Sequence, residues 1–80
     1  MNLGVVGNPR YADLAAVLRD LASLAPTLGV RLFSEPRLEP FWDGPVPFLE
    51  SAPLDALVTF GGDGTLLRGA RLLNGREVPI

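Results

Sequence analysis

The chain has 80 residues, enough for one small domain, and 48% of them are hydrophobic. Its net charge is −2, its seven basic residues are all Arg and lie scattered along the chain, and it contains neither Cys nor His. This composition excludes disulfides, thiol nucleophiles, zinc sites of the usual kind and a catalytic triad. It also lacks the basic clusters of nucleic-acid-binding proteins, so we expect no nucleic-acid partner.

The hydrophobic runs are too short for a membrane protein. None approaches the roughly 18 residues of a transmembrane helix, and the N-terminus, MNLGVVGNPR, lacks the basic region of a signal peptide. We therefore expect no membrane association, and the absence of Cys fits a cytoplasmic protein.

The first predicted element is a strand. Residues 2–6, NLGVV, form a short, apolar, β-branched run that is typical of a strand buried on both faces, and Gly7 closes it. The turn GNP follows, in which Asn8 and Pro9 suit the N-cap and the first position of a helix.

A helix and a second strand are predicted next. Apolar residues recur at three- and four-residue steps from Leu14 to Leu28, which is the spacing of an amphipathic helix with one apolar stripe. Pro26 should end or kink this helix, and Gly29 fits its terminus. Residues 30–33, VRLF, predict the second strand.

Residues 34–53 form a Pro-rich stretch for which we expect little regular structure. A loop this long in a compact domain is usually functional or partly disordered. We expect Phe41, Trp42 and Phe48 to cover the sheet edge or to form a subunit contact. The alternative is that these aromatic rings stack on a ligand.

The last part of the chain again alternates between strand and helix. Residues 55–60, DALVTF, predict a third strand, and residues 65–73 return to helical spacing before Asn74 and Gly75 close the helix. Residues 77–80, EVPI, look like the first residues of a fourth strand. This alternation predicts an α/β fold with a parallel sheet and right-handed crossovers.

We assign residues 1–80 to this single α/β domain. A parallel sheet normally needs cover on both faces, which two helices and a loop barely provide. We therefore expect an N-terminal piece of a longer protein. The alternative is a short natural chain that completes its core by association.

The most informative stretch is GGDGT, residues 61–65, which lies where the third strand gives way to a helix. Ligands of open parallel sheets bind at the carboxyl ends of the strands. Glycines permit positive φ angles and close approach, and successive N–H groups together with a helix N-terminus attract anions. Phosphate is the expected ligand, held without the P-loop lysine because the chain contains no Lys.

Asp63 is the unexpected residue in a phosphate site, because a carboxylate repels phosphate. It could accept a proton from an attacking hydroxyl or help to hold a divalent cation on the phosphates. Thr65 could cap the helix or donate to phosphate, and Arg68 and Arg71 could reach a ligand. The alternative is a tight turn in which Asp63 is only a helix N-cap.

The segment GGDGTLLRGAR, residues 61–71, resembles the signature of NAD kinases, which phosphorylate the 2′-hydroxyl of the adenosine ribose of NAD to give NADP. The GGDG core is shared with 6-phosphofructokinases and with diacylglycerol and sphingosine kinases, but the continuation TLLR favours NAD kinase. The resemblance implies a Rossmann-like parallel sheet with flanking helices. It also implies an incomplete N-terminal domain of a two-domain kinase whose β-rich second domain is not in this sequence.

Carried over by position, the resemblance implies roles for the residues of the signature. Asp63 matches the proton acceptor that activates the ribose hydroxyl. Asp63, Gly64 and Arg68 match positions that contact NAD. Gly61 and Gly62 match glycines near the phosphate donor.

Three further residues are assigned with an alternative beside them. Asn8 matches a polar residue near the nucleotide, and the alternative is a helix N-cap. Thr65 is placed with the phosphate and ATP site, and the alternative is again a cap. Arg71 either reaches the ligand or is solvent-exposed or in a structural ion pair.

The resemblance also implies substrates and partners. NAD and ATP are the expected substrates, polyphosphate is a second candidate donor, and Mg²⁺ is the default cation for phosphates. No residue is assigned as a metal ligand, and a homo-oligomer, dimer or tetramer, is expected for the full-length protein. Because NAD kinases are several times longer, we expect the isolated chain to be inactive. The rival functions are another GGDG-type kinase, acting on a lipid or sugar, and a module that binds nucleotide or phosphate without chemistry.

Overall fold

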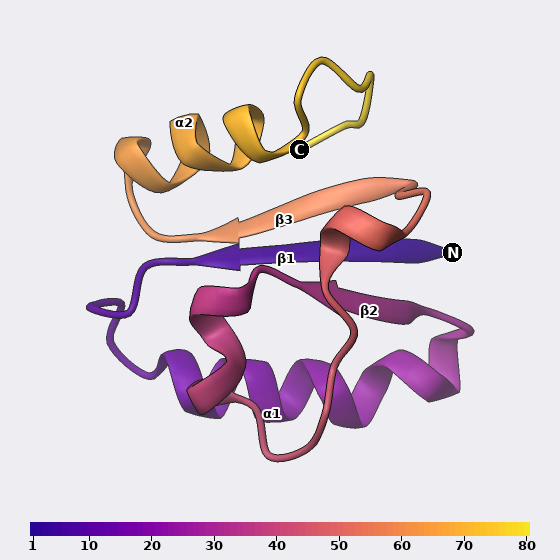
Figure 1. Ribbon diagram of the computed structural model, residues 1–80. Coiled ribbons are helices and arrows are strands. Elements are labelled where there is room, and N and C mark those ends of the chain that lie inside the picture. Colours follow the sequence, from indigo (N-terminus) through magenta and orange to yellow (C-terminus); the bar gives the residue numbers. More distant parts are fainter.

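A computed structural model describes the backbone of residues 1–80 and every side chain except that of Ser51. The described residues form a three-stranded, all-parallel sheet in the order β2-β1-β3 (Figure 1). Strand β1 spans Asn2–Gly7, β2 spans Arg31–Ser34 and β3 spans Ala56–Phe60. The predicted α/β, Rossmann-like parallel sheet with flanking helices is confirmed.

Two α-helices and three short 3₁₀ segments connect and cover these strands. Helix α1 spans Leu14–Leu24 and continues as η1, Ala25–Leu28. Segments η2, Pro36–Phe41, and η3, Leu49–Ser51, lie in the Pro-rich stretch, and α2 spans Asp63–Leu72. Pro26 does end the α-helical geometry, and Gly29 closes η1 in a left-handed conformation with φ 69°.

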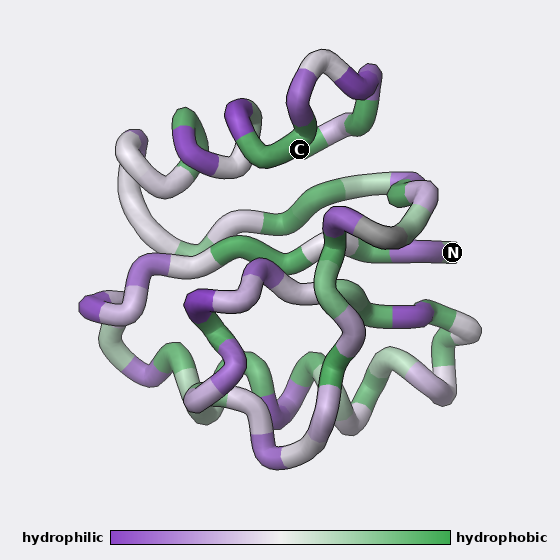
Figure 2. Tube along the Cα trace, viewed as in Figure 1, coloured by the Kyte–Doolittle hydropathy of each residue, from purple (hydrophilic) through white to green (hydrophobic). Residues whose placement is uncertain are grey.

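The sheet is buried on both faces because successive strand residues point to opposite sides. Side chains on one face pack beneath α1 and η2, namely Val5, Leu32 and Val58 against Leu14, Leu18, Leu38 and Trp42. Side chains on the other face pack beneath η3 and the end of α2, namely Val6, Phe33 and Leu57 against Leu49, Ala52 and Leu73. Figure 2 shows hydrophobic stretches along the strands and hydrophilic ones in many of the connections.

The Pro-rich stretch is more ordered than predicted. Its two 3₁₀ segments place Leu38 and Leu49 in the two cores, and Trp42 is 9% exposed. The indole Nε1 of Trp42 donates to Ser34 Oγ over 2.8 Å. The tryptophan therefore covers the sheet, which confirms the packing interpretation for this ring. Phe48 keeps 42% of its surface exposed.

The predicted start of the first helix is wrong. Helix α1 begins at Leu14 and not after Asn8, because the Asn8 side chain accepts from the Arg10 amide and closes a local turn. Asp13, in a left-handed conformation with φ 63°, then forms the N-cap.

The expected fourth strand at residues 77–80 is also wrong. Within the described chain these residues join no strand, and one hydrogen bond, from Leu57 N to Pro79 O over 2.7 Å, ties them to the free edge of β3. Pro79 has no N–H to continue a ladder.

Candidate functional site

The carboxyl ends of β1 and β3 bring the two glycine-containing turns together. The strands are paired with Gly7 opposite Phe60, so the residues that follow them, Asn8 and Gly61, are neighbours. The Asn8 amide donates to Phe60 O over 2.9 Å, which fixes this contact. Both turns lie at the same edge of the sheet in Figure 1, as predicted for ligand-binding parallel sheets.

Gly61 is required by the backbone. Its φ of 155° lies in a region that residues with a side chain rarely adopt. A Cβ added there would collide with Thr65 Oγ1 and would lie 3.1 Å from Asn8 Cβ. The glycine therefore lets the end of β3 pass directly against both residues, and it sets the entry of the chain into α2.

Helix α2 begins two residues earlier than predicted, at Asp63. Gly62 is its N-cap, and no side chain caps this end of the helix. The carbonyl of Gly62 accepts the amides of Thr65 and Leu66 over 3.0 and 3.2 Å. The amides of Asp63 and Gly64, at the positive end of the helix dipole, are left for water or a ligand. Asp63 is in the first turn, so the interpretation of Asp63 as the N-cap is wrong.

The outer side of this turn is open. Gly61, Gly62, Asp63 and Gly64 are all exposed. A Cβ added at Gly62 or Gly64 would meet nothing within 4 Å. Neither glycine is needed for packing inside this chain, whereas both leave room for a bulky group to approach the helix amides. The exposed Asp63 carboxylate would stand beside such a group.

Thr65 lies on the inner side of the same turn. It is 5% exposed, and its side chain packs against the backbone of Gly61. The structure therefore places Thr65 where it supports the turn, and its expected contact with phosphate stays a prediction. Asn8 is half-buried, and its Oδ1 accepts from the Arg10 amide over 2.9 Å.

Arg68 is engaged by the chain itself. Its Nη2 donates to Gly7 O over 2.6 Å and to Glu35 Oε2 over 2.8 Å. The same carboxylate oxygen accepts the Gly7 amide over 2.9 Å. The Arg68 Nε is buried and has no hydrogen-bond partner among the described residues. The predicted contact between Arg68 and NAD is thus untested by this geometry, and Arg71 is exposed one turn further along α2.

Glu35 was missed by the sequence reasoning. It follows β2 directly and is only 4% exposed. Many dinucleotide-binding sheets carry an acidic residue about 20 residues beyond their first glycine motif to bind ribose hydroxyls, and an acid directly after a strand was the available signal. Here Glu35 Oε2 already accepts from Gly7 and Arg68, so this carboxylate serves the protein interior.

The turn does not gather several acidic side chains. In the part of the chain whose side chains are described, no three acidic, His or Cys residues gather to hold a metal ion. Asp63 is the one acidic side chain in the turn itself, residues 61–65. These residues do not build a metal site by themselves, and a phosphate-bound Mg²⁺ would draw its ligands mainly from the phosphates.

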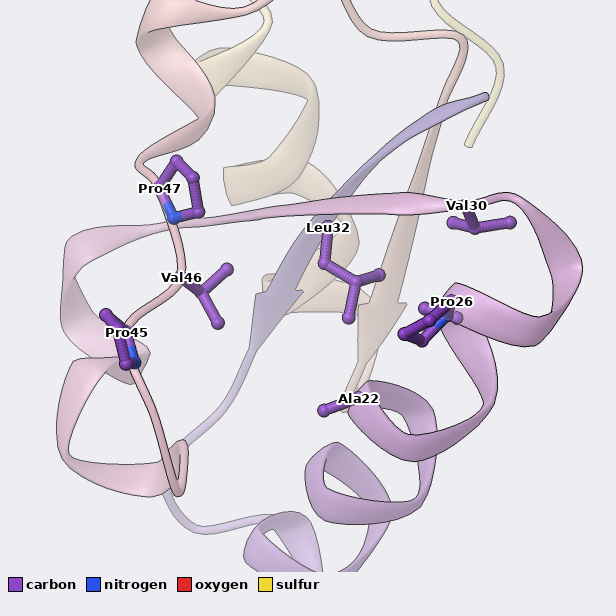
Figure 3. A pocket seen from close by; sticks show the side chains of 8 residues that line it. Ala22, Pro26, Val30, Leu32, Pro45, Val46 and Pro47 are labelled. Atoms are coloured by element: carbon purple, nitrogen blue, oxygen red, sulfur yellow. The ribbon is translucent and has the colours of Figure 1, made fainter.

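An apolar hollow of about 240 Å³ lies elsewhere, beside β2 (Figure 3). It is lined by small and apolar residues of α1, η1, β2 and the Pro-rich stretch, including Pro26, Val30, Leu32, Val46 and Pro47. Its lining carries no ionisable side chain, so the hollow offers no acid, base or charge for chemistry. The glycine-rich turn remains the better candidate site.

Nucleotide- and phosphate-binding proteins often use a helix start with open glycines at the carboxyl edge of a parallel sheet. Comparison with known proteins narrows this class. The chain is 48% identical over all of its 80 residues to an NAD kinase of Gemmatimonas aurantiaca, of which it covers 28%. It is 31% identical over 86 aligned positions to an NAD kinase of Syntrophotalea carbinolica, covering 98% of this chain and 29% of that protein.

A shorter stretch of 26 residues is 65% identical to an NAD kinase of Geobacter metallireducens and covers 32% of this chain and 9% of that protein. No family model and no solved structure matches the chain. The predicted resemblance is confirmed: the chain is similar, along its whole length, to the N-terminal part of NAD kinases. It spans less than a third of the length of these relatives.

Among the described residues, no helix is long and apolar enough to cross a membrane.

Proposed function

We propose that this chain contributes the GGDG-containing part of an NAD kinase, a cytoplasmic phosphotransferase that makes NADP from NAD. The donor is ATP or polyphosphate, and the acceptor is the 2′-hydroxyl of the adenosine ribose. Similarity to curated NAD kinases over the full chain supports the family, and the open glycine turn supports the site.

The observation that carries the mechanism is the position of Asp63. Its carboxylate is exposed in the first turn of α2, between two glycines that leave space on the outer side. In the proposed step the ribose 2′-oxygen attacks the terminal phosphorus of the donor and passes its proton to Asp63. The bond from that phosphorus to the leaving phosphate of the donor breaks, as in other phosphoryl transfers.

The other residues of the turn bind and orient in this proposal. The amides of Asp63 and Gly64 face the dinucleotide, and Gly61, Gly62 and Thr65 border the phosphate donor with Asn8 beside them. Mg²⁺ bound to the phosphates supplies charge neutralisation. The full-length protein is proposed to be a homo-oligomer with no nucleic-acid or membrane partner.

The isolated chain is proposed to be inactive, because one turn with a single carboxylate cannot enclose two substrates. The test is therefore a chimera in which these 80 residues replace the matching N-terminal segment of the Gemmatimonas aurantiaca relative. We expect the chimera to form NADP from NAD with ATP or polyphosphate, and the isolated chain to form none.

The same assay separates the rival functions. Turnover of a sugar or of diacylglycerol in preference to NAD would indicate another GGDG-type kinase. A chimera that folds and binds NAD but transfers no phosphate would indicate a binding module and would overturn the proposal.

A further inference from the structure

We propose that Glu35 and Arg68 form a positioning pair that holds the GGDGT turn in place, and that Arg68 acts through this pair and not by contacting the dinucleotide. The pair joins three elements at the carboxyl edge of the sheet. Glu35 follows β2, Gly7 ends β1, and Arg68 lies on α2, five residues after Asp63 in the sequence.

The geometry of the pair is closed around Gly7. Arg68 Nη2 donates to Gly7 O and to Glu35 Oε2, over 2.6 and 2.8 Å, and Glu35 Oε2 accepts the Gly7 amide over 2.9 Å. The last residue of β1 thus has both of its backbone polar groups bound by the pair. Nη2 of Arg68 ties α2 to β1, and the Glu35 carboxylate ties both to the end of β2.

Burial makes this arrangement costly to disturb. The side chain of Glu35 is 5% exposed and that of Arg68 is 25% exposed. A second arginine is also near this carboxylate, with Arg37 Nε 4.0 Å from Glu35 Oε1. The Arg37 side chain is 54% exposed, so solvent weakens its attraction to Glu35. Removing one partner of a buried ion pair leaves an uncompensated charge, whereas removing both is far less harmful.

The consequence for the site follows from the position of Arg68 in α2. Because its guanidinium is anchored on the inner side, Arg68 sets the distance of α2 from Asn8 and the orientation of the Asp63 carboxylate. This step rests on the proposed function, since the orientation matters to turnover only if Asp63 takes part in it. Small displacements of a catalytic group cost rate more than binding.

The first test uses the isolated chain and does not depend on catalysis. We compare urea midpoints and amide NMR shifts for Glu35→Gln, Arg68→Met and the double variant, with the exposed Glu39→Gln and Arg71→Met as matched controls. We expect each single change at the pair to lower the midpoint and to shift the amides of Gly61, Gly62 and Gly64. The double variant should have a midpoint above that of Arg68→Met. The proposed pair would be wrong if the decreases in urea midpoint were additive in the double variant. It would also be wrong if the amide chemical shifts of these glycines did not change in the single variants.

The second test uses the chimera and separates positioning from direct contact. If the pair acts by positioning, Glu35→Gln and Arg68→Met each lower kcat by a similar factor, roughly ten- to a hundredfold. The KM for NAD stays nearly unchanged in both variants. The loss of kcat in the double variant is then smaller than the product of the two single losses. If Arg68 instead contacts NAD, only Arg68→Met raises the KM, and the proposal is wrong. An inactive wild-type chimera would count against the proposed function alone, because the NMR and urea comparison still decides whether the pair holds the turn.

Discussion

Two strand-to-helix connections lie side by side at the carboxyl edge of this sheet, and they differ in what they do with their polar groups. Between β1 and α1, residues 8–13 close on themselves: Asn8 binds the amides of Arg10 and Tyr11, and the Leu14 amide binds Tyr11 O. Between β3 and α2 only Gly61 and Gly62 intervene.

The difference shows where the sequence leaves donors free. The first connection uses the amides of Arg10 and Tyr11 for its own turn and buries Leu14 at the helix start. The second starts its helix from a glycine, with no side-chain cap, and leaves the amides of Asp63 and Gly64 and the space above them open. Neither helix start has a side-chain cap. The feature that indicates binding is therefore the open space left by the glycines on both sides of Asp63.

The largest expected effect comes from exchanging the carboxylate at each connection. In the chimera, Asp63→Asn should lower kcat roughly 10²–10⁴-fold, because the hydroxyl loses its proton acceptor, while NAD affinity largely remains. Asp13→Asn is the matched control, since asparagine also tolerates the left-handed φ of 63° at that position. Steady-state NADP formation measures both. Surviving turnover in Asp63→Asn would show that Asp63 is not the base.

The next largest effect tests whether the second connection needs its first glycine. Gly61→Ala should destabilise the isolated chain by roughly 2–4 kcal/mol, because the φ of 155° becomes strained and the methyl collides with Thr65. Gly44→Ala, with nothing within 4 Å, should change stability by less than about 0.5 kcal/mol. Urea unfolding compares the two variants. Equal small losses would mean that the turn is looser than described.

A smaller effect separates packing from binding at Gly64. Nothing lies within 4 Å of an added Cβ, so Gly64→Ala should stabilise α2 by about 0.5 kcal/mol through the better helix propensity of Ala. In the chimera the same methyl should raise the KM for NAD roughly tenfold, because it fills the space proposed for the dinucleotide. We therefore expect this variant to be more stable and to have a higher KM for NAD. A gain in stability with no change in KM would place the ligand elsewhere.

Much of this fold follows from local patterns. The runs 2–6 and 55–60 and the helical spacing from Leu14 onward predicted the parallel sheet, because strand and helix periods are read over a few residues. The position of GGDGT at the carboxyl end of a strand followed for the same reason. The start of α1 did not, because propensity alone cannot tell that the Asn8 side chain closes a turn on Arg10.

The parts that sequence reasoning missed depend on distant contacts. Glu35 and Arg68 are far apart in the chain, and only the folded sheet places them on the same backbone residue, Gly7. The ordering of the Pro-rich stretch likewise comes from the burial of Leu38 and Leu49 in cores built by the strands. Residues 77–80 resemble a strand by composition, but in the described part of the chain they make a single hydrogen bond to β3, from Leu57 N to Pro79 O.

The measurement that tests the central contrast most directly is an amide NMR titration of the isolated chain with NAD and, separately, with ATP. We expect the amide signals of Gly62, Asp63 and Gly64 to change their chemical shifts, and the signal of the neighbouring Asn8 to change less. The amide signals of residues 10–13 should not change. Absent shifts at millimolar ligand, or equal shifts in residues 10–13, would contradict the assignment of the second connection as the binding turn.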